Sequence, residues 1–139
     1  MNLVDTSGWI EYFFSGENVS FFAKPIENTA ELIVPVVCLY EVFKKVNQVA
    51  DEARALKAIA HMKQGRIIEL SEEIALRAAL ISLKYKLPMA DSFVYATGLM
   101  EGAEIWTQDA DFKNLPGVWS QIQRGPSQRS FLMWYVAQE

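Results

Sequence analysis

Short apolar runs alternate with segments of helical periodicity along most of this chain of 139 residues. The apolar runs lack a polar face, which is typical of parallel strands covered on both sides. The segments between them repeat apolar residues every three or four positions, which indicates amphipathic helices. We therefore expect a single α/β domain with a central parallel sheet and helices on both faces.

The expected strands cover residues 3–4, 32–34, 67–70, 103–107 and 118–122. Serine and threonine cap helices by accepting a hydrogen bond from a backbone N–H. This preference places the start of the first helix at Thr6 or Ser7 and the start of a later one at Ser71. Further helices are expected from about residues 19, 36, 51 and 89, and Gly102 suits the end of the last one.

The amino-acid composition excludes several classes of functional site. Cys38 is the single cysteine and stands in an apolar run, so we expect a buried thiol and exclude a disulfide framework. His61 is the single histidine, which excludes paired-imidazole nuclease chemistry and favours a packing or surface role. No apolar run approaches the roughly 18 residues of a membrane span, and no signal-peptide pattern is present, so we expect a cytoplasmic protein. The net charge of −4 is unlike that of a general nucleic-acid binder.

Carboxylates stand where the expected strands end. Asp5 directly follows the first strand, and Asp109 follows the fourth, with Asp111 two residues later. Glu41 lies in the helix after the second strand, and Asp91 opens the helix before the fourth. Ligands of open α/β sheets bind outside the carboxyl ends of the strands, where gathered carboxylates repel one another unless a hard cation joins them. The pattern predicts a Mg²⁺ or Mn²⁺ site for phosphodiester chemistry.

Each acid also has a structural interpretation. Asp5 can cap the first helix, and Glu41 can pair with a lysine one turn later. Asp91 can complement the positive end of its helix, while Asp109 and Asp111 can be turn residues. The convergence of four of these residues on one edge of the sheet favours the metal site.

Hydroxyl groups flank the acids in the sequence. Thr6 and Ser7 follow Asp5, and Thr107 precedes Asp109. We expect these hydroxyls, together with Asp111, to orient the carboxylates or bound water molecules rather than to hold the ion themselves. Helix capping and strand-end hydrogen bonds are the alternative roles.

Four blocks of the sequence carry a family resemblance. They are VDTSGWI at residues 4–10, CLYEV at 38–42, MADSFVYAT at 89–97 and IWTQDADF at 105–112. The last block, with its Thr-x-Asp-x-Asp-Phe pattern, is the most specific. In these blocks and their order the chain resembles a PIN domain, and most closely the compact VapC-type toxins of prokaryotic toxin–antitoxin pairs. The resemblance extends from residue 1 to about residue 122.

The resemblance implies a three-layer α/β/α fold and an endoribonuclease that depends on Mg²⁺ or Mn²⁺. It implies metal ligation by Asp5 and Asp91, with Glu41 and Asp109 completing the acidic cluster. It also implies an RNA substrate, a homodimer, and a cognate antitoxin that covers the site. The PIN-like nuclease domain is expected to span residues 1–123. Residues 124–139 are expected to form a C-terminal extension packed on the same domain or on a second subunit.

Three other readings remain open. A PIN-fold interaction module without activity would keep the fold but not cleave RNA. A phosphatase of the haloacid-dehalogenase type also begins with an Asp after a strand, but it needs a second acid where this chain has Ser7. A structural or interaction protein would carry all these acids as solvated surface, and it would bind no divalent ion.

Overall fold

The computed structural model describes residues 1–121, so the expected extension at residues 124–139 lies outside the described part. Five parallel strands form one sheet in the order β3-β2-β1-β4-β5. The strands are β1 (Asn2–Val4), β2 (Leu32–Pro35), β3 (Arg66–Ile68), β4 (Glu104–Thr107) and β5 (Val118–Ser120). The expected α/β fold with a central parallel sheet is thus confirmed.

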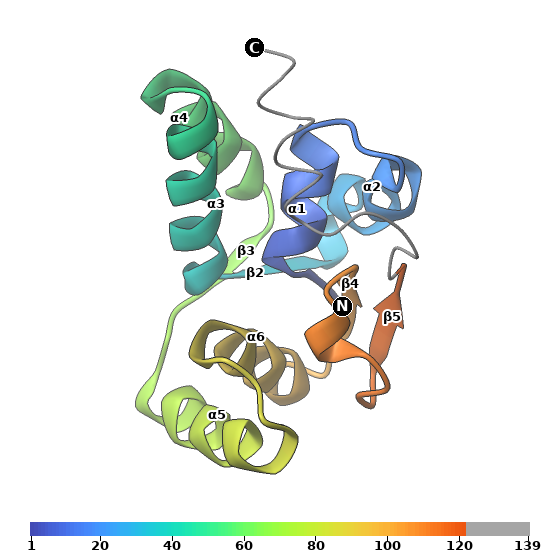
Figure 1. The fold of residues 1–139 in the computed structure, drawn as a ribbon, viewed down its shortest axis with the longest axis vertical. Coiled ribbons are helices and arrows are strands. Elements are labelled where there is room, and N and C mark those ends of the chain that lie inside the picture. Colours follow the sequence, from blue (N-terminus) through green and yellow to red (C-terminus); the bar gives the residue numbers. More distant parts are fainter. Residues whose placement is uncertain (122–139) are drawn as a thin grey trace.

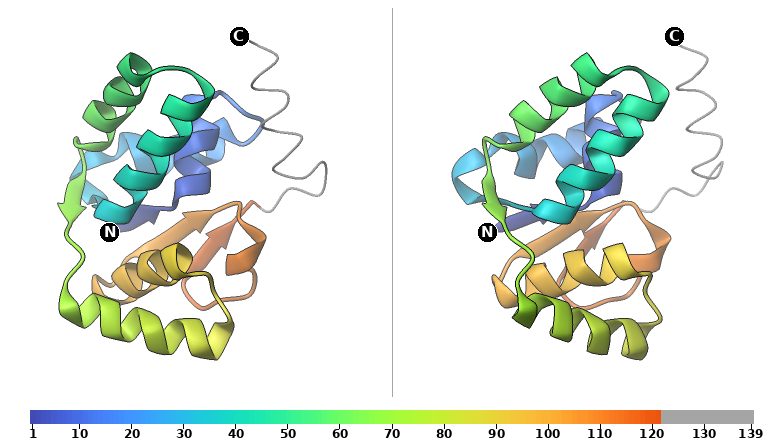
Figure 2. Two further views of the ribbon diagram at one scale, coloured as in Figure 1. Left: turned by 60° about the vertical axis from the view of Figure 1, so that its left-hand side comes forward. Right: turned by 90° about the vertical axis from the view of Figure 1, so that its left-hand side faces the viewer.

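Helices cover both faces of the sheet and complete the three-layer α/β/α fold. One layer holds α1 (Thr6–Phe13), α2 (Val19–Glu27), α3 (Val36–Val49) and α4 (Glu52–Met62). The other holds α5 (Glu72–Tyr85) and α6 (Met89–Met100). Figure 1 and both views of Figure 2 show the sheet between these two groups. Short 3₁₀ turns, η1 (Thr29–Glu31) and η2 (Ala110–Phe112), precede β2 and follow β4.

The direction of strand addition reverses at β1. The chain builds outward from β1 to β2 and β3 through the first helical layer, then returns through α5 and α6 to place β4 on the other side of β1. Connections from β1 and β4 therefore leave the sheet in different directions, and we call the region outside their carboxyl ends the crevice. This is the position where open α/β sheets bind ligands.

Helix and strand ends differ from the expected ones at a few positions. The N-cap of α1 is Asp5, whose carboxylate accepts a hydrogen bond from Gly8 N, so the interpretation of Asp5 as a cap is confirmed and the assignment of this cap to Thr6 or Ser7 was wrong. Aspartate caps as well as serine does, and Asp5 is the residue that retains extended backbone geometry. β2 extends one residue beyond the expected strand and ends at Pro35, which is also the N-cap of α3.

The apolar core lies on both sides of β1. The single cysteine and the single histidine of the chain both pack in or against it. Cys38 is fully buried, and the ring of His61 packs against the rings of Trp9, Tyr12 and Phe13, so both packing predictions are confirmed. In the described part of the chain, no helix is long and apolar enough to cross a membrane.

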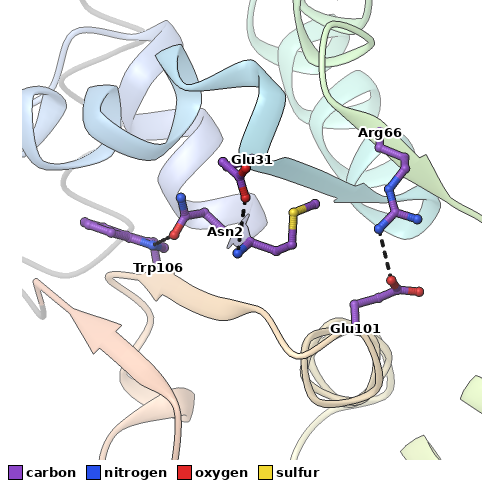
Figure 3. Close-up of polar contacts among 6 residues, drawn as sticks. Asn2, Glu31, Arg66, Glu101 and Trp106 are labelled. Atoms are coloured by element: carbon purple, nitrogen blue, oxygen red, sulfur yellow. Dashed lines mark hydrogen bonds and ion pairs between the residues drawn. The ribbon is translucent and has the colours of Figure 1, made fainter.

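Polar contacts involve residues at the amino ends of β1 and β3, on the edge opposite the crevice. The Trp106 indole donates to Asn2 Oδ1 at 3.0 Å and joins β4 to β1 (Figure 3). Arg66 at the start of β3 pairs with Glu101 at the end of α6, with an N–O distance of 3.1 Å.

Close packing at Gly8 gives a test of this core. A Cβ atom there would lie 2.5 Å from Val4 Cγ1 and 2.5 Å from Phe22 Cε1. We expect Gly8→Ala to lower the free energy of unfolding by about 1–3 kcal/mol, because overpacking outweighs the gain of about 1 kcal/mol in helix propensity. Ser20→Ala, on the exposed face of α2, should change stability by less than about 0.5 kcal/mol. Urea denaturation measures both, and a stabilised Gly8→Ala variant would contradict the packing.

Candidate metal centre

Asp5 stands at the carboxyl end of β1, in the crevice. Its side chain is 3% exposed, and both of its carboxylate oxygens accept hydrogen bonds. Oδ1 accepts from the Ser7 hydroxyl at 2.6 Å and from Gly8 N at 3.0 Å. Oδ2 accepts from the Thr107 hydroxyl at 2.5 Å. The carboxylate therefore joins the start of α1 to the end of β4.

The loop after β4 turns two further acids toward the crevice. The Thr107 hydroxyl, which donates to Asp5, also accepts from Asp109 N at 2.9 Å. Asp109 Oδ1 in turn accepts from Asp111 N at 2.9 Å and caps η2. Buried Phe112 anchors the end of this turn in the core. The positions of Asp109 and Asp111 thus depend on the same hydrogen-bond chain that holds Asp5.

Asp91 meets these two acids from the opposite side of the crevice. It lies in the first turn of α6, in the second helical layer. One carboxylate oxygen from each of Asp91, Asp109 and Asp111 lies within 4.8 Å of the other two. Asp91 and Asp109 are half-buried and Asp111 is exposed. Three oxygen donors on a partly open rim are a donor set that suits Mg²⁺ or Mn²⁺, which prefer oxygen ligands and retain several waters.

Burial, together with neighbouring like charge, raises the pKa of Asp91 and of Asp109. The pKa of Asp91 is raised from 3.8 to about 8, with burial as the largest cause; the charges of Asp109, Asp111 and Asp5 and a hydrogen bond to Asp111 contribute to the same rise. Burial is also the largest cause that raises the pKa of Asp109. A divalent cation among these groups would reverse the effect, because it favours their charged forms.

Asp5 is perturbed less because its hydrogen bonds oppose its burial. Its pKa is raised from 3.8 to about 6 as the net result of burial, which is the largest cause and raises it, of the bonds from Ser7, Thr107 and Gly8, which lower it, and of the charge of Asp109, which raises it. Each carboxylate oxygen can accept two hydrogen bonds. Oδ2 of Asp5 uses one of these positions and has a second one available to a ligand.

Glu41 occupies a different place from the other expected ligands. It does not belong to the group of three acids, and its Oε1 accepts a hydrogen bond from the Thr6 hydroxyl at 2.7 Å. Fully buried Cys38 lies behind the crevice, where burial raises its thiol pKa and the charges of Asp5, Glu41 and Asp91 add to that shift. Glu41 thus borders the crevice from α3.

The structure therefore brings Asp91, Asp109 and Asp111 together, with Asp5 beside them and Glu41 at the border. Of the three hydroxyls, Ser7 and Thr107 bond to Asp5, and Thr6 bonds to Glu41. Asp111, expected only to support the ligands, also has a carboxylate oxygen within 4.8 Å of those of Asp91 and Asp109.

Sequence reasoning missed one buried acid near this site. Glu11 is fully buried in α1, and its carboxylate accepts hydrogen bonds from Asn18 N at 3.0 Å and Gln108 Nε2 at 2.7 Å. The sequence did contain a sign of this burial, because Glu11 is the lone charged residue in the apolar run from Trp9 to Phe14. A buried carboxylate needs such partners, so its position pointed to a polar network inside the first layer.

Residues 3–118 match the family model of the PIN domain. No curated protein matches the chain significantly. A toxin–antitoxin complex from Klebsiella pneumoniae superposes with a TM-score of 0.68 at 27% identity, covering 86% of this chain and 96% of that one. A DNA-bound VapBC from Salmonella typhimurium gives a TM-score of 0.69 at 14% identity, covering 87% and 98%. VapC20 of Mycobacterium tuberculosis, described as a Sarcin-Ricin loop cleaving toxin, gives 0.67 at 14% identity, covering 81% and 92%.

These matches agree with the acid-lined crevice and with the strand order, and they confirm the resemblance seen in the four sequence blocks. The family model spans most of the described chain, and the structural neighbours are VapC toxins and VapBC toxin–antitoxin complexes. The chain belongs to the PIN domain family.

Proposed function

We propose that this protein is an endoribonuclease that depends on Mg²⁺ or Mn²⁺ and acts as the toxin of a toxin–antitoxin pair. The observation that carries the proposal is the meeting of Asp91, Asp109 and Asp111 within 4.8 Å beside buried Asp5. Perturbed carboxyl groups gathered in a crevice are a hallmark of functional sites, because a folded protein gains nothing from their repulsion. Membership of a nuclease family supports the same conclusion.

The proposed ligand set is Asp5, Glu41, Asp91 and Asp109. Asp111 joins this set as a further candidate, because it lies in the same group as Asp91 and Asp109. Glu41 reaches the ion directly or through a water, with the Thr6 hydroxyl fixing its orientation. A bound divalent ion supplies a more acidic water and stabilises negative charge on the phosphate. The acids would hold the ion in their charged forms and release their protons to solvent as it binds.

An RNA substrate is proposed from the family rather than from a basic surface. With a net charge of −4, the protein has little general attraction for a polyanion. The acidic crevice repels phosphate until a cation is present. We therefore expect the metal ion to bind before the RNA substrate. The Sarcin-Ricin loop activity described for the Mycobacterium tuberculosis neighbour is the type of reaction proposed here.

A cognate antitoxin is the proposed protein partner. Structural neighbours from Klebsiella pneumoniae and Salmonella typhimurium are toxin–antitoxin complexes. In this chain, an open groove of about 670 Å³ runs along α3 and α4 and presents Leu39, Tyr40, Phe43 and Ile59. Tyr40 is 63% exposed, which is unusual for a large side chain in a cluster of apolar residues. An antitoxin segment with apolar anchors would fit this groove and border Glu41 on the same helix.

A homodimer is proposed through α5. Leu76, Leu80 and Leu83 lie at helical spacing on this helix and are 64%, 69% and 80% exposed. They form an apolar stripe on the outer surface of the second layer, where α5 lies farthest from the first layer (Figure 2). Burial of such a stripe against a second copy removes apolar area from water on both subunits.

Asp91→Asn tests the metal-dependent reaction. The change keeps the shape of the side chain and removes a charge that holds the cation, so cleavage in Mg²⁺ or Mn²⁺ should fall by about 100-fold or more, as for other groups that stabilise transition-state charge. The melting temperature of the metal-free variant should stay level or rise, because repulsion is relieved. Cleavage of total RNA and thermal unfolding measure the two effects.

Glu104→Gln is the matched control for this variant. Glu104 is an exposed acid at the amino end of β4, on the opposite edge of the sheet, and its loss should leave cleavage unchanged. A folded Asp91→Asn protein that cleaves at the wild-type rate would rule out the proposed mechanism. Absence of cleavage by the wild-type protein in both metals would favour the inactive interaction module.

The pH dependence of stability follows from the raised pKa values. Asp5 and Asp91 titrate at about 6 and about 8 in the folded protein, against 3.8 without perturbation. At a pH between 3.8 and these raised pKa values, the folded state holds more protons than the unfolded state. The free energy of unfolding of the metal-free protein therefore falls as the pH rises through this range. In Asp91→Asn one of these groups is lost, and the decline should be shallower. Urea denaturation with a chelator from pH 4.5 to pH 8.5 measures it, and equal slopes for the two proteins would contradict the assignment.

Leu80→Glu tests the dimer. A charge in the middle of the exposed stripe on α5 should shift the protein to the monomer without a large loss of melting temperature, since Leu80 is 69% exposed. Leu56→Glu places the same charge at a comparably exposed leucine of α4 and should leave the dimer intact. Light scattering after size-exclusion chromatography measures both. A shift caused by Leu56→Glu alone would place the interface on the first layer instead.

A further inference from the structure

Glu11 is the most deeply buried acid of the described chain, and it lies outside the metal centre. Its side chain is 0% exposed, against 3% for Asp5. Space for the carboxylate is kept open by Gly16, where a Cβ atom would lie 1.8 Å from Glu11 Oε1. Burial of a carboxylate is costly unless its oxygens are hydrogen-bonded, so the partners of Glu11 indicate what this position does.

Glu11, Asn18 and Gln108 form a closed ring of hydrogen bonds that includes this carboxylate, both side-chain amides and the backbone N of Asn18. Glu11 Oε1 accepts from Asn18 N at 3.0 Å, and Oε2 accepts from Gln108 Nε2 at 2.7 Å. Asn18 Nδ2 closes the ring by donating to Gln108 Oε1 at 3.0 Å. Both ends of the Gln108 amide are therefore fixed, one by Glu11 and the other by Asn18.

Gln108 connects the ring to the metal centre because it lies between Thr107 and Asp109. Its backbone N donates to Ser7 Oγ at 3.2 Å, and the Ser7 hydroxyl donates to Asp5. The next backbone N, that of Asp109, donates to Thr107 Oγ1 at 2.9 Å. The side chain of Gln108 holds the loop on the first helical layer, while the backbone on either side carries the acids.

We infer that Glu11 and Gln108 are positioning residues that set Asp109 and Asp111 at the distance from Asp91 that a divalent ion requires. The inference rests on the proposed function and identifies residues that hold the proposed metal ligands in place. The competing role is purely structural, in which the ring only fastens the turn after α1 through Asn18. The two roles differ in what the loss of the ring should change. Positioning predicts a loss of metal affinity, whereas fastening predicts a loss of stability alone.

Exchange of the two side chains separates these roles. Gln108→Glu places a second carboxylate against Glu11, so the ring breaks and the loop must move. In the double variant Glu11→Gln/Gln108→Glu, the amide at position 11 accepts from Asn18 N and donates to the new carboxylate at 108. That carboxylate still accepts from Asn18 Nδ2, so every bond of the ring has a donor and an acceptor.

Mn²⁺ affinity is the main readout, measured by calorimetry on the full chain, with RNA cleavage and melting temperature beside it. We expect Gln108→Glu to weaken Mn²⁺ binding by about 10- to 100-fold, as for other residues that orient metal ligands, and the double variant to recover most of that loss. Ser82→Ala is the stability control. It removes a 2.7 Å hydrogen bond to Leu87 O at the end of α5 and should lower the melting temperature without changing Mn²⁺ affinity.

Gln108→Ala covers the case in which Gln108→Glu does not fold, because it removes the ring without adding charge. The inference is overturned if a folded Gln108→Ala or Gln108→Glu protein binds Mn²⁺ as the wild type does, or if the exchanged double variant folds without regaining affinity. Failure of the proposed function looks different. A wild-type protein that binds Mn²⁺ but cleaves no RNA would contradict the nuclease proposal and leave the result on metal affinity intact.

Discussion

The hydrogen bond from the Thr107 hydroxyl to the Asp5 carboxylate is the contact on which the rest of the site depends. It joins the ends of β1 and β4, the two strands between which the direction of the sheet reverses. The other oxygen of the same carboxylate caps α1 through Gly8 N. One buried side chain therefore fixes the start of the first helix, the end of a neighbouring strand and one wall of the crevice. Gly8, which packs against β1 and α2, must stay small for this arrangement to close.

The same geometry creates an electrostatic cost that the fold does not remove. Asp91 approaches from α6, in the opposite helical layer, and meets Asp109 and Asp111 in a partly buried crevice. Without a cation, Asp91 holds its proton near neutral pH, because burial and the neighbouring acids raise its pKa to about 8. The free energy gained by burying the apolar core outweighs this repulsion. A bound divalent ion would replace the repulsion by attraction and would stabilise the folded protein. Stability, metal binding and the proposed cleavage are thus three consequences of one cluster of charge.

The sequence predicted the sheet because its strands are short apolar runs, and their carboxyl ends placed Asp5, Asp91 and Asp109 on one edge. Local patterns could not separate neighbouring candidates within a motif. Asp5 rather than Thr6 or Ser7 caps α1, since capping depends on which residue keeps extended backbone geometry. The ring at Glu11 was missed for another reason. Its partner Gln108 lies 97 positions away in the sequence, and only the packing of α1 beside the loop after β4 brings them together.

The central claim is that Asp91, Asp109 and their neighbours hold a divalent ion between the two helical layers. The most direct measurement is a crystal structure of the full chain grown with Mn²⁺, with data collected for anomalous scattering. The account predicts one or more anomalous peaks in the crevice, within coordination distance of carboxylate oxygens of Asp91 and Asp109. Well-ordered carboxylates without an anomalous peak at saturating Mn²⁺, or a peak bound only elsewhere on the surface, would contradict it.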